Sequence, residues 1–140
     1  METRTGFAPD TETVSAERSR ASSGVVVAGD EGTRALLQGL LRMNQIPAVG
    51  EAGGENEGFE LVRRHRPTLL VIDASLTEGS WTGLVGQARA LLPQLRVILI
   101  APAATPPAPV NEVSLQPDVT LLRPFLLRDF VGALVRPDPG

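Results

Sequence analysis

The 140-residue sequence has no cysteine, no lysine and no tyrosine, and its single histidine is His65. Without cysteine there is no disulfide framework, no thiolate nucleophile and no zinc site of the cysteine type. Without lysine, Schiff-base enzymes, P-loop nucleotide sites and lysine general bases are excluded. These absences remove several large classes of enzyme, and the chain is not expected to be one.

The sequence also lacks long runs of basic residues and long runs of apolar residues. All thirteen basic residues are arginine; against sixteen acidic residues they give a net charge of −3. Because the arginines are scattered, nucleic acid is not expected as the main partner. No apolar stretch reaches the roughly 18 residues that a membrane span needs, so no membrane association is expected. The start lacks the apolar segment of a signal peptide, and a cytoplasmic location is therefore expected.

The chain divides into two tails and one domain. Residues 1–23 are rich in threonine, serine, glutamate and arginine and have few apolar side chains, so we predict a disordered tail there. Two prolines interrupt residues 136–140, and a short tail is predicted at 137–140. The folded unit is predicted to be residues 24–136, which is enough for a single domain.

Apolar runs typical of strands alternate in this unit with segments that have helical periodicity. The strands are predicted at residues 25–28, 46–50, 68–72, 95–100 and 119–122, and the helices at 33–43, 55–66, 83–92 and 128–135. Residues 101–117 contain five prolines, so a fourth crossover helix is predicted to be shortened or lost. This alternation predicts an α/β fold with a parallel sheet.

Ligands of such sheets bind beyond the carboxyl ends of the strands, so the residues found there are the candidate site. Gly29, Asp30 and Glu31 follow the first strand, and Asp73 follows the third. Ala101 follows the fourth strand, 28 positions after Asp73, and the fifth ends in Arg123-Pro124-Phe125, with Arg123 50 positions after Asp73.

This order and spacing resemble the receiver domain of bacterial response regulators, over about residues 24–136. In that family an acid pair, an Asp, a Thr or Ser, and Lys-Pro-Phe follow successive strands. The resemblance implies a flavodoxin-like, doubly wound sheet of five parallel strands in the order 2-1-3-4-5. It also implies a magnesium ion held by the acids, a phosphoacceptor Asp, and a hydroxyl and a lysine that bind the phosphoryl group.

By this resemblance Asp73 is the phosphoacceptor candidate; the alternative is an Asp that caps the turn after its strand. The phosphate-site lysine is replaced by Arg123, which keeps the charge and could pair with Asp73 directly. The hydroxyl position is lost to Ala101, and the aromatic switch position is lost to Thr120. The Arg123-Pro124 bond is a candidate for the cis form that the family's Lys-Pro adopts.

The acid pair has two alignments. Aligned on the first strand it falls on Gly29 and Asp30; aligned on the following helix it falls on Ala28 and Gly29. A metal site would then use Asp30, Glu31 and Asp73, with magnesium as the cofactor if the acids function. Alternatively, Asp30 and Glu31 only stabilise the positive N-terminal end of that helix.

The missing groups predict a degenerate, stand-alone pseudo-receiver. It would act in signal transduction through protein–protein contacts without phosphorylation, with a signalling protein, a histidine kinase or a second copy of itself as partner. One alternative is a phosphorylatable receiver of a two-component system, with Asp73 as acceptor and Arg123 in place of lysine. Another is a small flavodoxin-like nucleotide-binding module, although the Gly29–Gly32 stretch lacks the glycine fingerprint. Trp81 is predicted either to cover the site or to pack on the flank of the domain.

Overall fold

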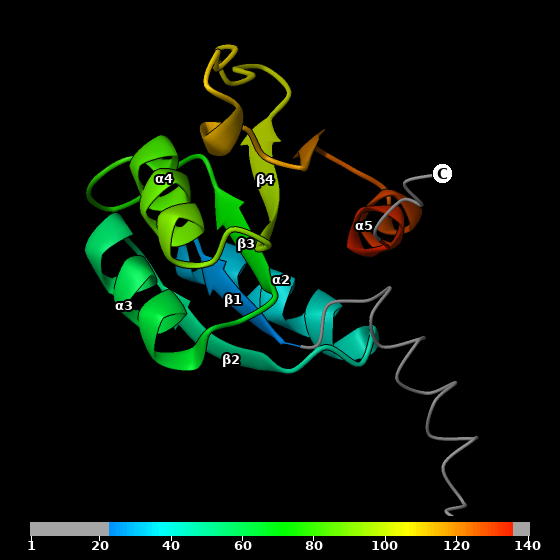
Figure 1. Ribbon diagram of the computed structural model, residues 1–140. Helices are drawn as coiled ribbons and strands as arrows, with labels where there is room; N and C mark the ends of the chain where they lie inside the picture. Colours follow the sequence, from blue (N-terminus) through cyan, green and yellow to red (C-terminus); the bar gives the residue numbers. More distant parts are fainter. Residues whose placement is uncertain (1–22, 136–140) are drawn as a thin grey trace, which may run out of the picture.

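The computed structural model describes residues 23–135, so the predicted tails lie outside the described residues except for Ser23. A parallel five-stranded sheet with strand order β2-β1-β3-β4-β5 forms its centre (Figure 1). The strands are β1 Gly24–Val27, β2 Ala48–Ala52, β3 Leu69–Asp73, β4 Arg96–Pro102 and β5 Val119–Arg123. The predicted flavodoxin-like sheet and its strand order are confirmed.

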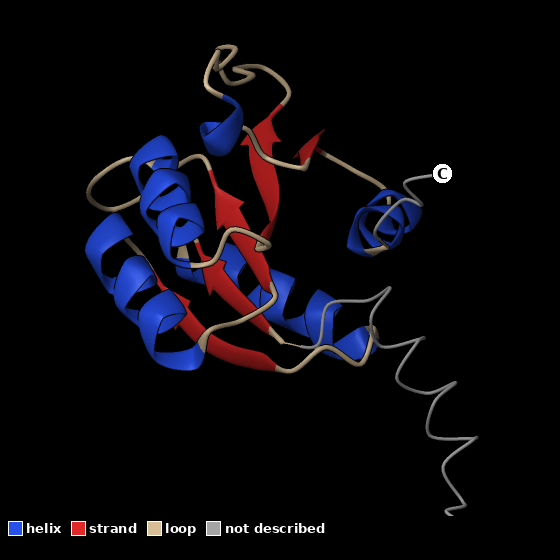
Figure 2. Cartoon of the chain, in the orientation of Figure 1, coloured by secondary structure: helices blue, strands red, loops and turns tan. Residues whose placement is uncertain are grey.

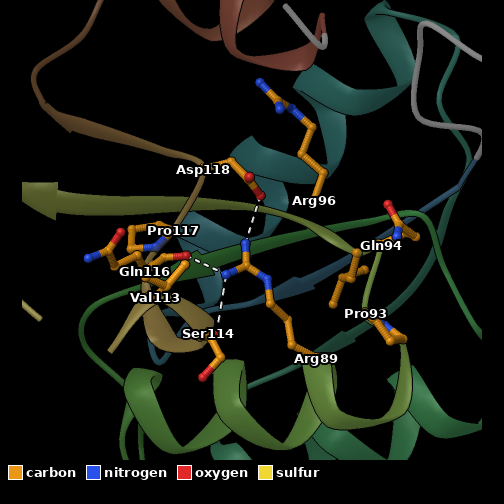
Figure 3. A pocket seen from close by; sticks show the side chains of 10 residues that line it. Arg89, Pro93, Gln94, Arg96, Val113, Ser114, Gln116, Pro117 and Asp118 are labelled. Atoms are coloured by element: carbon orange, nitrogen blue, oxygen red, sulfur yellow. Dashed lines mark hydrogen bonds and ion pairs between the residues drawn. The ribbon is translucent and has the colours of Figure 1, made fainter. Parts of the chain in front are cut away.

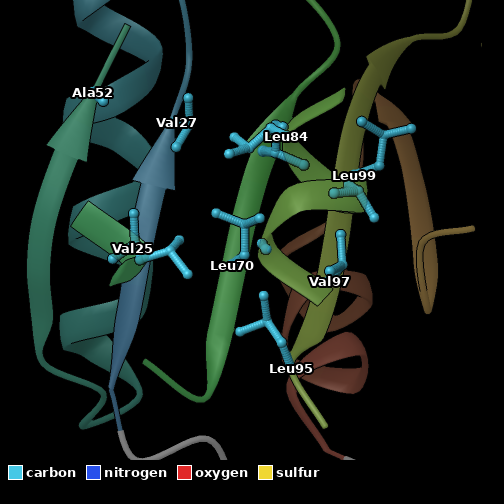
Figure 4. Close-up of a cluster of buried hydrophobic side chains, with 12 residues drawn as sticks. Val25, Val27, Ala52, Leu70, Leu84, Leu95, Val97 and Leu99 are labelled. Carbon is cyan, nitrogen blue, oxygen red and sulfur yellow. The ribbon is translucent and has the colours of Figure 1, made fainter. Parts of the chain in front are cut away.

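Four α-helices cover the two faces of the sheet (Figure 2). They are α2 Glu31–Met43, α3 Glu55–His65, α4 Trp81–Leu91 and α5 Leu127–Leu134. Helices α3 and α4 pack on one face through a core that includes Val25, Leu70, Leu84 and Leu99 (Figure 4). Helices α2 and α5 pack on the other face, around Val26, Leu37, Val71 and Phe130. No helix within residues 23–135 is long and apolar enough to cross a membrane.

Local hydrogen bonds explain where the predicted element boundaries are wrong. Helix α2 begins at Glu31 rather than at residue 33, because the Asp30 carboxylate accepts the Thr33 N–H at 2.8 Å and acts as its N-cap. Helix α4 begins at Trp81 rather than at residue 83, because the Ser80 hydroxyl caps Gly83 N–H. Strand β2 begins two residues late, because the Ile46 N–H is bonded to Leu41 at the end of α2.

The segment between β4 and β5 contains only one 3-10 turn, η1, at Val113–Leu115, so the predicted loss of the fourth crossover helix is confirmed. An arginine from α4 fixes this segment instead (Figure 3). The Arg89 guanidinium donates to the carbonyls of Ser114 and Gln116 and to the Asp118 carboxylate, the last at 2.8 Å. Asp118 also accepts the Val97 N–H of β4 at 2.7 Å. A cavity of about 570 Å³ remains beside these contacts.

Replacing Arg89 by alanine is expected to lower the free energy of unfolding by about 1.5–3 kcal/mol, the range for hydrogen bonds that involve a charged group. The Arg89 side chain is only 13% exposed, so water replaces its contacts poorly. Amide exchange should also accelerate at Ser114 and Gln116. Arg42→Ala is the matched control, since Arg42 is exposed and its side chain, within residues 23–135, bonds the Gln38 side chain. Equal effects of the two substitutions in urea denaturation would contradict this role of Arg89.

Candidate functional site

Asp73 lies at the carboxyl end of β3 and is buried, with 2% of its surface exposed. Its Oδ1 accepts the Ser75 N–H at 2.8 Å, and its Oδ2 accepts Nη1 of Arg123 at 2.8 Å. Arg123 ends β5 and leaves 35% of its side chain exposed. The direct pairing of Arg123 with Asp73 considered from the sequence is therefore present, and the Ser75 contact is the turn-capping contact. Both carboxylate oxygens already have protein partners.

The strand register shows which of the candidate positions for the acid pair lie beside Asp73. Val27 of β1 lies beside Ile72 of β3, so the next residue, Ala28, lies beside Asp73. Ala28 is fully buried. The N–H of Gly29 donates to the Ser75 carbonyl at 2.9 Å, and a Cβ at Gly29 would lie 2.9 Å from the same oxygen. The two positions beside the phosphoacceptor candidate are thus Ala28 and Gly29, and neither has a carboxylate.

Asp30 and Glu31 have the helix-stabilising role that was the alternative to metal binding. The Thr33 N–H, and after it the Thr33 hydroxyl, lower the pKa of the Asp30 carboxyl. Desolvation opposes this change, and the charges of Arg34 and Arg123 lower the pKa by smaller amounts. Glu31 is exposed in the first turn of α2. Within residues 23–135 no three Asp, Glu or His side chains gather in a way that could hold a metal ion. The structure does not assemble Asp30, Glu31 and Asp73 into the predicted metal set.

An arginine approaches the carboxyl end of β1 where the family has acids. Nη1 of Arg34 donates to the Ala28 carbonyl at 2.7 Å, and its Nε donates to Glu51 at 3.0 Å. Ala28 and Gly29 offer no side-chain oxygen, and a guanidinium repels a divalent cation. The residues at these strand ends therefore do not fit a magnesium ion.

The structure also locates the other positions at which the sequence departs from the family's pattern. Ala101, at the hydroxyl position in β4, is fully buried, and Thr120, at the aromatic switch position in β5, is exposed. Thr105 does not replace the lost hydroxyl from within the strand, because it lies in the turn after β4, where its N–H bonds the Pro102 carbonyl. The Arg123-Pro124 peptide bond is cis.

The loop from residue 74 to residue 80 is fastened across the ends of β1 and β2, which the sequence did not reveal. Besides the Gly29–Ser75 bond, the Thr77 N–H donates to the Gly53 carbonyl at 2.8 Å. The Glu78 carboxylate accepts the Asn56 N–H at 3.0 Å at the start of α3. In this way the loop that follows Asp73 is tied to the N-terminal end of α3.

Glu55 makes the reciprocal contact, from α3 to the start of α4. Its Oε1 accepts the Ser80 N–H at 2.9 Å and its Oε2 accepts the Gln87 side-chain amide at 2.8 Å. Gly79, with φ of 76°, lies against Glu55 where a Cβ would clash. The only sequence signal for this exchange is a glutamate near glycines in each segment, and nothing local pairs the two.

Replacing Glu78 by alanine is expected to lower the free energy of unfolding by about 0.5–2 kcal/mol, the usual value of a helix N-cap. Faster amide exchange at Ser75 and Thr77 should accompany the loss. Glu57→Ala is a matched control, because Glu57 is an exposed acid in the same first turn of α3. If Glu57→Ala loosens the loop as much as Glu78→Ala, the fastening does not depend on Glu78.

Substituting Asp30 by asparagine should keep the N-cap and remove its pH dependence. Since the pKa of the Asp30 carboxyl is lowered by folding, its ionised form stabilises the protein above the pKa of the unfolded state. That stability is lost as the pH falls through the folded-state pKa. The difference in unfolding free energy between the parent and Asp30→Asn should therefore be largest near pH 7 and shrink in acid. Urea denaturation across this range is the measurement; a pH-independent difference would contradict it.

Trp81, the first residue of α4, is partly buried against the core that α3 and α4 share. It also borders a cavity of about 340 Å³ beneath the proline-rich segment that follows β4. Trp81 was predicted either to cover the site or to pack on the flank of the domain. Within the described residues, its contacts are those of packing on the flank.

Comparison with solved structures identifies the fold. The chain is similar to the receiver domain of AraT, a response regulator from Geobacillus stearothermophilus, with 25% identity and a TM-score of 0.65 over 80% of this chain and 91% of that one. It is also similar to a CheY-like receiver domain from Methanospirillum hungatei, with 17% identity and a TM-score of 0.68 over 79% and 88% of the two chains. A receiver domain from Clostridium thermocellum matches at 13% identity and a TM-score of 0.68, over 81% and 90%.

No family model matches the sequence, and no curated protein matches it. The resemblance to response regulator receiver domains that the strand ends carry is nevertheless confirmed by the structural neighbours. The chain has the receiver-domain fold.

Proposed function

We propose that this chain is a receiver-like signalling domain that acts through protein–protein contacts and does not depend on phosphorylation. The observation that carries the proposal is the state of Asp73, whose two carboxylate oxygens are bonded to Ser75 and Arg123. The loss of the acid pair to Ala28 and Gly29 and of the hydroxyl to Ala101 supports it. A phosphoryl group on Asp73 would have to displace the Arg123 contact and would find no hydroxyl at residue 101 to bind it.

Exposed apolar side chains on α5 and on the connection that leads to it from β5 support the protein–protein part of the proposal. We call them the β5–α5 patch; it consists of Leu126, Leu127, Val131 and Val135, which are all exposed. Exposed apolar side chains that gather on one element of a domain are typical of binding sites for other proteins. The expected occupants are a signalling protein, a histidine kinase or the same patch of a second copy.

The test is a titration with magnesium and beryllofluoride, followed by Trp81 fluorescence and backbone amide shifts. We expect no saturable change at Asp73, Ala101 or Arg123. Asp73→Asn is the matched control for nonspecific effects of the ions, and Arg123→Lys shows whether the family's lysine alone restores a response. A saturable, magnesium-dependent change that Asp73→Asn abolishes would overturn the proposal.

The second candidate function is a phosphorylatable receiver of a two-component system. It is favoured by the guanidinium of Arg123, which lies 2.8 Å from Oδ2 of Asp73, at the strand end from which a cation could bind phosphoryl oxygens. Incubation with acetyl phosphate and intact-mass measurement separate the two candidates. Incorporation of one phosphoryl group that is lost in Asp73→Asn would establish this second function, whereas no incorporation would support the first.

A further inference from the structure

The segment that replaces the fourth crossover helix stands out from the carboxyl end of the sheet, at the top of Figure 1. It contains Pro106, Pro107 and Pro109, and no side chain from residue 101 to residue 111 is charged. Residues 106, 108 and 109 are exposed, whereas Pro107 and Val110 are half-buried. Within residues 106–110 the half-buried positions therefore recur with a definite period.

That period is three residues. The two outward-facing prolines are separated by three positions, and so are the two inward-facing residues, Pro107 and Val110. A proline ring fixes φ near −65°, and a residue that precedes proline is held in extended conformations. Both constraints favour the polyproline II helix, which has three residues per turn and no internal hydrogen bonds. Pro106 and Pro109 then lie on one edge of such a helix, one turn apart.

The inward edge anchors the segment to the domain. Residues 107–110 line one side of the cavity of about 340 Å³, which Trp81, Leu99 and Thr120 also line. Pro109 borders this cavity and is exposed at the same time. The Gln116 side-chain amide donates to the Val110 carbonyl at 2.9 Å. At the other end, the Ala103 N–H donates to the Arg123 carbonyl at 3.0 Å. The segment is thus held at both ends with its outer edge uncovered.

We propose that the edge formed by Pro106 and Pro109 is a docking surface for a partner protein with an aromatic-lined, proline-recognising groove. Aromatic grooves bind polyproline II segments because the helix is already extended and little entropy is lost on binding. Because a polyproline II helix has no internal hydrogen bonds, its carbonyls can accept bonds from tyrosine hydroxyls or indole N–H groups. The lack of charge from residue 101 to residue 111 favours an apolar groove over a charged one.

This inference goes beyond the proposed function. It needs neither the β5–α5 patch nor an unphosphorylated Asp73, and it names a different surface. A receiver with the second candidate function would present the same prolines.

The test uses the full chain labelled with nitrogen-15 and three unlabelled probes, which are an SH3, a WW and an EVH1 domain in large excess. At least one probe should give saturable amide shifts confined to Thr105, Ala108, Val110 and their neighbours. The double variant Pro106→Ala, Pro109→Ala should bind that probe about tenfold or more weakly, a loss typical of a hot spot. Pro93→Ala is the matched control, since Pro93 is exposed in another turn, and should bind as the parent does.

Trp81 emission shows whether the fold survives the substitutions. The double variant should leave the emission unchanged because Pro107 still borders Trp81, whereas Pro107→Ala should shift it. Four outcomes would overturn the proposal: no saturable shift with any of the three domains, equal binding by the double variant, shifts centred on the β5–α5 patch, or shifts that follow only self-association of the chain. A Leu127→Ser variant that still binds the probe keeps this test separate from that of the proposed function.

Discussion

Replacing Arg123 by alanine is expected to lower the free energy of unfolding by about 1–3 kcal/mol, the cost of leaving a buried acceptor without its partner. Asp73 would keep only the Ser75 N–H as a partner while it stays almost fully buried. The cost stays below the roughly 3–5 kcal/mol of a fully buried broken pair, because the Arg123 side chain is 35% exposed and water can enter its place.

The reverse substitution, Asp73→Asn, should cost less. The asparagine carbonyl can still accept the Ser75 N–H, and the exposed part of Arg123 can turn to water. Urea denaturation of the parent and both variants measures this asymmetry. If Asp73→Asn destabilises the protein as much as Arg123→Ala, the burial of the carboxylate does not control the energetics of the pair. Asp73→Asn is also the control in the magnesium titration, so its stability can be compared with its response to the ions.

Substituting Phe130 by alanine should have the largest effect, about 3–5 kcal/mol, as for other large-to-small changes of buried aromatic side chains. Phe130 has no exposed surface and packs α5 against Val26, Val71 and Ile100 of the sheet. Its ring also stacks on Phe125, with centroids 6.2 Å apart. Without it a cavity forms where α5 meets the sheet.

Leu127→Ala is the matched control on the same helix. Leu127 is 49% exposed, so its truncation should change the free energy of unfolding by less than about 0.5 kcal/mol. Binding of a partner at the β5–α5 patch should depend more on Leu127 than on Phe130, because Leu127 belongs to the patch and Phe130 does not. Equal destabilisation by the two substitutions in thermal or urea denaturation would show that α5 is not held through Phe130.

The sequence pattern was enough to predict the parallel sheet and the shortening or loss of a helix, and the resemblance to receiver domains implied the strand order. Short apolar runs that alternate with helical periodicity are local signals, and prolines exclude a helix wherever they cluster. Asp73 and Arg123 could likewise be placed at the same edge of the sheet, because the carboxyl ends of parallel strands meet there. Element boundaries were less certain, since single caps such as Asp30 and Ser80 set them.

Contacts between distant segments were decided only by the tertiary structure. The register of β1 against β3 put Ala28 beside Asp73, a difference of one residue that no local pattern fixes. The exchange of Glu55 and Glu78 between two helix starts, and the bonds from Arg89 to the segment after β4, join residues more than twenty positions apart. Absent lysine and cysteine excluded chemistries from composition alone, because a missing group cannot act in any fold. What the remaining groups do depends on packing, which brings Arg123 onto Asp73 and turns Pro106 and Pro109 outward.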